Sequence, residues 1–321
     1  KIFVSTFLTT QVLTSLPETT ASLIRGVLAK LHKAGYPVAG FDMYVTSTVL
    51  PGSGLSSSAA CEVLIGTTGN HLFCQDKFDA VEIAKIGQAA ENEYFGKPCG
   101  LMDQTASSVG DAVAIDFKDP ANPIVRSINA DLTGLGLALC IIDCGADHAA
   151  LTNEYASIPE EMCKVAAHFG KKVLREVKEE DLLADLAQVR KEAGDRAVLR
   201  ALHFYADDRR AAEEADALER KDKEAFLNLV KESGRSSWEL LQNITPAAAI
   251  THQDMAVALA VAENALNGKG ACRVHGGGFA GTIQAFVPVE DVCEFKKTME
   301  TMLSEGCCHV LSIRPAGGLI L

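Results

Sequence analysis

The 321-residue chain lacks several patterns that would assign it to a class of protein at once. It has no run of the roughly 18 apolar residues that a membrane-spanning helix needs, and Thr, Ser and Gln interrupt its apolar N-terminal segment. It has no GxxxxGK[ST] phosphate loop. Its formal net charge is -12, and an acidic chain repels phosphate backbones. We therefore expect neither a membrane nor a nucleic acid as a partner.

The cysteine pattern lacks any CxxC pair, although ten cysteines are present. Cys307 and Cys308 are adjacent, and neighbouring cysteines rarely bond to each other. The others are scattered through apolar stretches, without the spacing of a zinc site. We interpret them as reduced, mostly buried thiols and expect a cytoplasmic protein.

The composition is that of a globular protein, with 48% hydrophobic and 22% charged residues. Helical periodicity and charged residues dominate from residue 151 to about 265, and their charges are most simply a solvated face. The shift near residue 147 predicts two domains, 1–147 and 148–321. Strands and helices mix without regular alternation, which favours the α+β class.

Local patterns predict the elements that carry the motifs discussed below. Apolar stripes indicate helices, and β-branched, alternating runs indicate strands. The predicted helices are 18–35, 58–73, 78–95, a short helix from about 101, and 289–304. The predicted strands are 41–50, 112–117, 124–129, 135–143, 271–275, 282–288 and 309–313.

A glycine-serine loop lies between a predicted strand and a predicted helix. It consists of Pro51, Gly52, Ser53, Gly54, Leu55, Ser56, Ser57 and Ser58. The glycines permit backbone angles that other residues avoid, and the serines fall at a helix start, where free N–H groups attract anions. The local chemistry fits a phosphate site and an ordinary serine-capped turn about equally well.

Two acids follow this loop. Asp103 lies in the first turn of a short helix, where an aspartate usually compensates the helix dipole. Glu91 lies near the end of a helix, where a glutamate usually faces solvent. Taken singly, both have structural explanations. A kinase, however, needs one carboxylate near the acceptor hydroxyl and another oxygen ligand for magnesium.

A run of three glycines, Gly276, Gly277 and Gly278, joins two predicted strands. It fits either a plain hairpin connection or a tight loop with exposed N–H groups. His275 before it could reach a phosphate, but we favour packing under the loop. Tyr155, on a predicted helix, is by default a core residue.

Three motifs together resemble the GHMP kinases, and in particular their galactokinase branch. PGSGLSSSAA resembles the second family motif, GKPCGLMDQ the galactokinase signature, and RVHGGGFAG the third motif. The resemblance implies that loop 51–58 and Gly276–Gly278 bind ATP, and that Ser58 and Glu91 hold Mg²⁺. It also implies that Asp103 is the catalytic base and that Gly100, Asp103 and Tyr155 contact the sugar.

The resemblance also implies a fold and an activity. The fold is a two-domain GHMP kinase, with an N-terminal domain like the second domain of ribosomal protein S5 and a ferredoxin-like C-terminal domain. The reaction is transfer of the γ-phosphate of ATP to D-galactose, by a monomer. The alternatives are another sugar of the same family, such as N-acetylgalactosamine or arabinose, a sugar and ATP sensor without turnover, or an inactive paralogue.

The sequence departs from the family pattern in three places. Ala280 stands where a glycine is usual, and His275 where a small hydroxyl residue is more common. The family's first motif, which binds the sugar and supplies an arginine, is absent. We therefore expect Lys1 to lie inside a longer protein, and this chain alone to be a poor enzyme.

Overall fold

The computed structural model describes residues 2–5, 19–49, 56–145, 151–279 and 281–321. The chain divides into two compact units, which we call unit 1 (1–129 with 313–321) and unit 2 (130–312). Strand β5 (Leu137–Asp143) belongs to unit 2, because it pairs with the other strands of that unit. The domain boundary after residue 147 stays a prediction.

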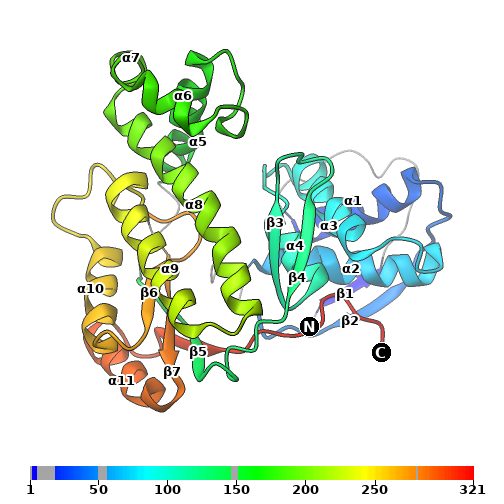
Figure 1. The fold of residues 1–321 in the computed structure, drawn as a ribbon. Coiled ribbons are helices and arrows are strands. Elements are labelled where there is room, and N and C mark those ends of the chain that lie inside the picture. The colour runs from blue at the N-terminus through cyan, green and yellow to red at the C-terminus, as the bar shows by residue number, and fades with distance from the viewer. Residues whose placement is uncertain (1, 6–18, 50–55, 146–150, 280) are drawn as a thin grey trace. The chain divides into compact units, whose positions relative to one another are not determined.

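Unit 1 consists of helices and two small antiparallel sheets (Figure 1). The helices are α1 (Thr20–Lys33), α2 (Ser57–Cys74), α3 (Ala80–Ala90), the π-helix η1 (Glu91–Phe95) and α4 (Met102–Val109). Strand β1 (Ile2–Ser5) pairs with β2 (Asp42–Val45), and β3 (Ala112–Asp116) pairs with β4 (Ile124–Ile128). The predicted helix 78–95 is therefore divided, with a change of helix type at residue 91.

Helix α1 shows how the sequence builds this unit. The Thr19 hydroxyl accepts a hydrogen bond from the backbone N–H of Ser22, and the Ser22 side chain returns to Thr19, which is a capping box. The apolar stripe of the helix is buried in a core shared with α2 and α3. Burying such a stripe is the main source of helix stability in a protein.

The last residues of the chain return to unit 1 beside α4. The Gly318 N–H donates to the Ser108 carbonyl at 3.1 Å, and the Asp111 N–H donates to the Arg314 carbonyl at 2.8 Å. A Cβ atom on Gly317 would collide with the Ser108 carbonyl. Glycine at 317 therefore permits this close backbone approach, which supports the helix that carries Asp103.

Unit 2 is built on a four-stranded antiparallel sheet of order β6-β7-β5-β8. The later strands are β6 (Ala271–Val274), β7 (Thr282–Pro288) and β8 (Cys308–Leu311). Helices separate β5 from β6 and β7 from β8, while β6 and β7 are joined directly. This succession and strand order are those of a ferredoxin-like βαββαβ unit, as the resemblance implies.

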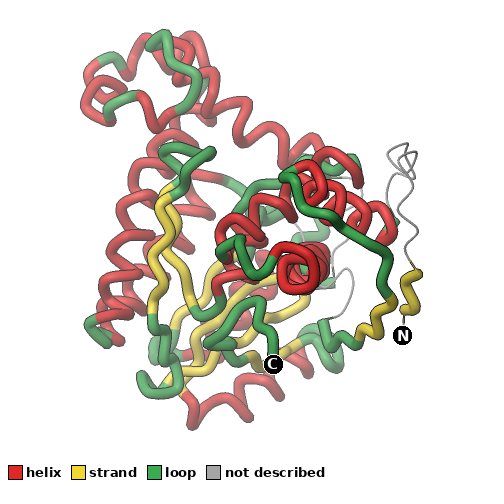
Figure 2. Tube along the Cα trace, turned by 90° about the vertical axis from the view of Figure 1, so that its right-hand side faces the viewer, coloured by secondary structure: helices red, strands yellow, loops and turns green. Residues whose placement is uncertain are grey.

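Helices make up the remainder of unit 2 (Figures 1 and 2). They are α5 (Thr152–His168), η2 (Leu174–Glu176), α6 (Glu179–Ala184), α7 (Leu186–Ala193), α8 (Asp195–Glu219), α9 (Lys223–Ser236), the π-helix η3 (Ser237–Leu241), α10 (Asp254–Leu266), η4 (Val289–Asp291) and α11 (Val292–Met302). Helices α10 and α11 share an apolar core with the sheet, and α5 to α8 enclose a second one.

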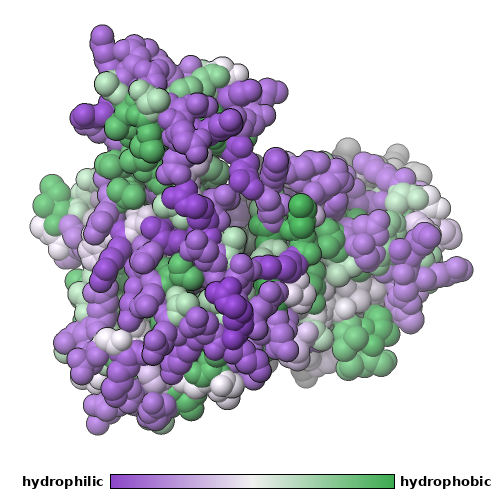
Figure 3. Space-filling model, viewed as in Figure 1, coloured by the Kyte–Doolittle hydropathy of each residue, from purple (hydrophilic) through white to green (hydrophobic). Residues whose placement is uncertain are grey.

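The surface of the charged helices in unit 2 agrees with the prediction that their charged side chains face solvent. Figure 3 shows a largely hydrophilic surface over α8 and α9, the long charged helices. No helix among the described residues is long and apolar enough to cross a membrane. The α+β class is confirmed.

Candidate active site

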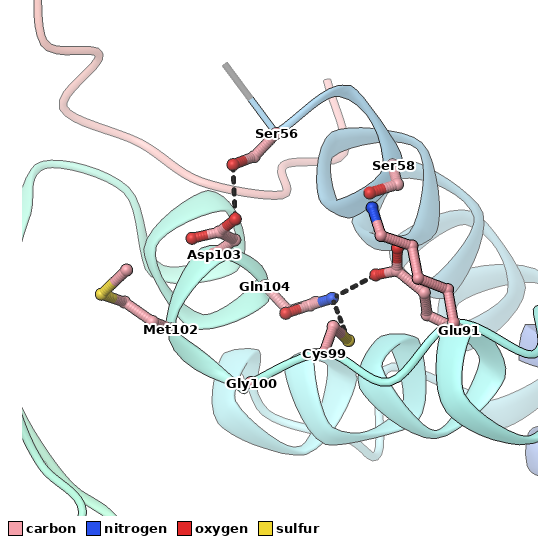
Figure 4. A pocket seen from close by; sticks show the side chains of 9 residues that line it. Ser56, Ser58, Glu91, Cys99, Gly100, Met102, Asp103 and Gln104 are labelled. Carbon is pink, nitrogen blue, oxygen red and sulfur yellow. Dashed lines mark hydrogen bonds between the residues drawn. The ribbon is translucent and has the colours of Figure 1, made fainter. Parts of the chain in front are cut away.

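Unit 1 contains a pocket of about 410 Å³ where the start of α2, the start of η1 and the start of α4 meet (Figure 4). Its lining includes two acids, two serines and a lysine. The lining residues are Ser56, Ser58, Glu91, Lys97, Cys99, Gly100, Met102, Asp103 and Gln104. Five residues that the sequence nominates for the site, Ser56, Ser58, Glu91, Gly100 and Asp103, therefore lie around one cavity.

The start of α2 keeps its N–H groups available. Ser56 is the N-cap residue, but its hydroxyl makes no capping hydrogen bond, and the first turn contains no acidic side chain. Ser56 also has a left-handed backbone with φ of 55°, which costs free energy in a residue other than glycine. Uncapped N–H groups and the positive end of the helix dipole together favour an anion.

The Ser56 hydroxyl instead donates to Asp103 Oδ2 at 2.6 Å, across to α4. Asp103 is exposed on the first turn of α4, and the N-cap of that helix, Leu101, makes no side-chain capping bond. The carboxylate is thus accessible within the pocket and tied to the helix start that could bind an anion. The Asp103 carboxylate is held beside the start of α2 by this bond to Ser56, which lies 47 positions earlier in the chain.

Glu91 is buried, with 3% of its surface exposed, whereas a helical glutamate usually faces solvent. It is the first residue of η1, and π-turns inside helices occur frequently at functional sites. Its Oε2 accepts a hydrogen bond from Gln104 Nε2 at 3.0 Å. In Figure 4 the side chains of Glu91, Ser58 and Gln104 point toward the same space.

Glu62 lies behind this pocket and is a functional candidate that the sequence reasoning missed. It is completely buried and accepts a hydrogen bond from the same Gln104 Nε2 at 3.0 Å. Burial raises the pKa of Glu62 to about 8, the nearby Glu91 acts in the same direction, and the Gln104 amide opposes them. Glu62 follows Ser58 by four positions on α2, so a shared helix face was the signal available in the sequence.

Cys99, at the pocket wall, carries a thiol that is not suited to act as a nucleophile. Burial raises the pKa of the Cys99 thiol to about 12, and Glu91 acts in the same direction. A thiol is reactive in its ionised form, which is scarce at neutral pH with such a pKa. Cys99 is therefore not the group that carries out the chemistry of the pocket.

Ser57 is the first residue of α2 in unit 1 and does not line the pocket. The other nominated residues lie in unit 2, apart from those outside the described residues. Gly276 and Gly277 are exposed, and the Gly278 carbonyl accepts a hydrogen bond from the Tyr155 hydroxyl at 2.8 Å. His275 Nδ1 lies 2.9 Å from the Thr282 hydroxyl. Tyr155 therefore supports the glycine run, and its predicted sugar contact stays a prediction. Residues 51–55 of the glycine-serine loop and Ala280 lie outside the described residues.

The residues available for a metal ion fit magnesium. Mg²⁺ prefers oxygen ligands and is usually bound through one or two carboxylates together with substrate phosphates. The pocket places the Ser58 hydroxyl and the Glu91 carboxylate beside a helix start suited to phosphate. Among the described residues, no group of three or more His, Cys, Asp or Glu side chains is arranged to hold a metal ion.

Comparison with known proteins agrees with this geometry. Residues 22–111 match the model of the GHMP kinase N-terminal domain. A Lactococcus lactis galactokinase, solved in complex with galactose, has the same fold at a TM-score of 0.77 and 22% identity, over 98% of this chain and 80% of its own. An L. major mevalonate kinase, solved in complex with R-mevalonate, matches at a TM-score of 0.60 and 13% identity, over 94% of this chain and 78% of its own. The fold is thus the one that GHMP kinases have, and residues 22–111 match the N-terminal domain of that class.

Sequence relatives narrow the class. A Streptomyces coelicolor protein named galactokinase is 33% identical over 275 residues, which are 86% of this chain and 68% of that protein. An Actinobacillus pleuropneumoniae galactokinase is also 33% identical, over 85% of this chain and 68% of its own length. The chain belongs to the galactokinase family, whose members are ATP-dependent sugar kinases.

Proposed function

We propose that the protein transfers the γ-phosphate of ATP to the anomeric hydroxyl of D-galactose, giving α-D-galactose 1-phosphate and ADP. Membership of the galactokinase family supports this reaction. The observation that carries the site assignment is the hydrogen bond from Ser56 to Asp103, because it joins an anion-binding helix start to an exposed carboxylate in one pocket. Phosphoryl transfer depends chiefly on such positioning.

The residues then have the following roles. The start of α2 and loop 51–58 hold the phosphates through backbone N–H groups. The family resemblance implies that Gly276–Gly278 also contact ATP. Ser58 and Glu91 hold Mg²⁺, which neutralises phosphate charge when bound. Gly100 and Tyr155 contact the sugar. Asp103 accepts the proton of the sugar hydroxyl as its oxygen bonds to the γ-phosphorus and the bond from that phosphorus to ADP breaks.

A sugar panel tests the proposal. ATP consumption by the intact protein is measured with galactose, N-acetylgalactosamine and arabinose at matched concentrations. We expect galactose to give the highest kcat/KM. If either of the other sugars exceeds it, the proposed acceptor is wrong. Binding of galactose and ATP without any turnover would instead indicate a sensor.

Two further properties belong to the proposal. A cytoplasmic location is supported by ten cysteines that are all free thiols, as is usual in a reducing compartment. The monomeric state stays a prediction, which light scattering or sedimentation of the purified protein would check.

A further inference from the structure

A single amide joins the three elements that carry the proposed chemistry. Gln104 is 1% exposed, and its Nε2 lies 3.0 Å from an oxygen of Glu62 and 3.0 Å from an oxygen of Glu91. A glutamine amide has two N–H donors, which suffice for one hydrogen bond to each carboxyl group. The same Nε2 also lies 3.5 Å from Cys99 Sγ at the pocket wall.

The positions of these residues along the chain make the arrangement specific. Gln104 directly follows Asp103 on α4, and Glu62 lies one helical turn after Ser58 on α2. Glu91 begins η1. The amide therefore connects the helix of the proposed base, the helix of the proposed metal-binding serine and the turn of the proposed metal-binding glutamate.

We propose that Gln104 is a positioning residue that holds Glu91 for metal binding, with Glu62 as its fixed anchor on α2; this inference rests on the proposed function. A carboxylate that ligates a metal usually has its other oxygen fixed by a hydrogen bond, and removing such a partner costs about 10–100-fold in metal affinity or activity. Gln104 supplies this bond to Glu91, and the bond to Glu62 fixes Gln104.

Gly87 on α3 leaves the space that this arrangement occupies. A Cβ atom there would lie 3.1 Å from Glu62 Cβ, 3.2 Å from Glu62 Oε2 and 3.5 Å from Gln104 Cγ. Its backbone is helical, and alanine is intrinsically the better helix former. Gly87→Ala therefore perturbs the hydrogen-bonded group by crowding, without removing any of its atoms and without weakening the helix.

The test compares Gln104→Met, which keeps the length but loses both hydrogen bonds, with Thr105→Val. Thr105 is a completely buried neighbour whose hydroxyl donates to the Leu101 carbonyl within α4, away from the pocket lining. The dissociation constant of Mn²⁺ is measured by electron paramagnetic resonance with a non-hydrolysable ATP analogue. We expect it to rise about 10–100-fold in Gln104→Met and to remain unchanged in Thr105→Val.

Glu62→Gln and Gly87→Ala keep the inference testable if Gln104→Met does not fold. The glutamine at 62 still offers an oxygen to the Gln104 amide, so Mn²⁺ affinity should be retained, whereas Gly87→Ala should weaken it. Folded Gln104→Met, or folded Gly87→Ala, with wild-type Mn²⁺ affinity would overturn the inference. Failure of the proposed function is distinct, because it appears in the wild-type protein as a lack of galactose-dependent ATP consumption.

Discussion

Unit 2 buries a cation beside an anion, whereas unit 1 buries two acids beside each other. Arg200 in unit 2 is completely buried and donates to Glu161 at 2.9 Å, to the Ser157 hydroxyl at 2.9 Å and to the Leu241 carbonyl at 3.1 Å. In unit 1, Glu62 and Glu91 are buried acids that both accept hydrogen bonds from the amide of Gln104. Arg200 is paired with an acid inside the fold, whereas neither buried acid of unit 1 has a buried cation as its hydrogen-bond partner among the described residues.

The difference separates a structural site from a functional one. Removing one partner of a buried ion pair leaves an uncompensated charge and strongly destabilises the fold, so such a pair has a structural role and offers no free charge to a ligand. Two buried acids beside each other are costly, so a protein tolerates them mainly where a cation or a proton is used. We therefore expect variants at Arg200 to change stability, and variants at the acids of the unit 1 pocket to change catalysis, metal binding or pH dependence.

The largest effect is expected at Asp103. In Asp103→Asn the side chain still accepts the Ser56 hydrogen bond but cannot take a proton, so kcat should fall by about 10²–10⁴ with ATP affinity retained. Glu93→Gln is the control, because Glu93 lies on the same π-turn as Glu91 but pairs with Lys30 and does not line the pocket. An unchanged kcat in Asp103→Asn would contradict the role of Asp103 as the catalytic base.

The next largest effect is expected on the stability of the protein when Arg200 of unit 2 is replaced. Replacing Arg200 with Met leaves Glu161 partly uncompensated, and breaking a buried pair costs about 3–5 kcal/mol of unfolding free energy. The loss should lie near the low end, because Arg196 also binds Glu161. Chemical denaturation measures it, with Arg196→Met, at a more exposed arginine, as the milder control. A change in Mn²⁺ affinity instead of stability would contradict the division between the units.

The third prediction concerns pH and Glu62. Its folded-state pKa of about 8 lies above the ordinary value of 4.5, so the native protein binds more protons between these values. The contribution of Glu62 to stability is therefore fully present below pH 4.5 and is lost as pH rises through about 8. Glu62→Gln should flatten this part of the stability profile. A wild-type contribution that grows across this window would contradict the assignment.

Much of the fold and several residues of the candidate site were predictable from the sequence, because motifs carry short-range chemistry. The glycine-serine loop, Asp103 and the run of three glycines were singled out from the order of residues in the sequence. Strand and helix periodicity located the main elements, including the helix that starts at Ser57 and the sheet of unit 2. Residues close in sequence keep a nearly fixed spacing within a helix or a strand, so local patterns predict these elements and their short motifs well.

The buried acids were not readable, for a physical reason. A regular helix through residue 95 predicts an exposed Glu91, but the π-turn that begins there adds a residue per turn and changes which side chains face inward. Gln104 was quoted within a motif without a role, because a buried amide and a solvated one look alike in sequence. Its partners lie 42 and 13 positions away, beyond the reach of periodicity.

The smallest effect on stability is expected at His168 in unit 2, which pairs with two acids near the surface. Its two ring nitrogens lie 2.7 Å from Asp185 and 2.8 Å from Glu192, and these hydrogen bonds raise the pKa of His168 above 6.5. The ion pairs therefore stabilise the protein below pH 6.5, and this contribution is lost as pH rises through the raised pKa. Both carboxylates are about half exposed, so solvent screens the pairs and the effect on stability should be slight. His168→Gln should remove this pH dependence and leave that of Glu62 intact in denaturation profiles. If His168→Gln instead altered the profile attributed to Glu62, the two units would not titrate independently, and the comparison between them would fail.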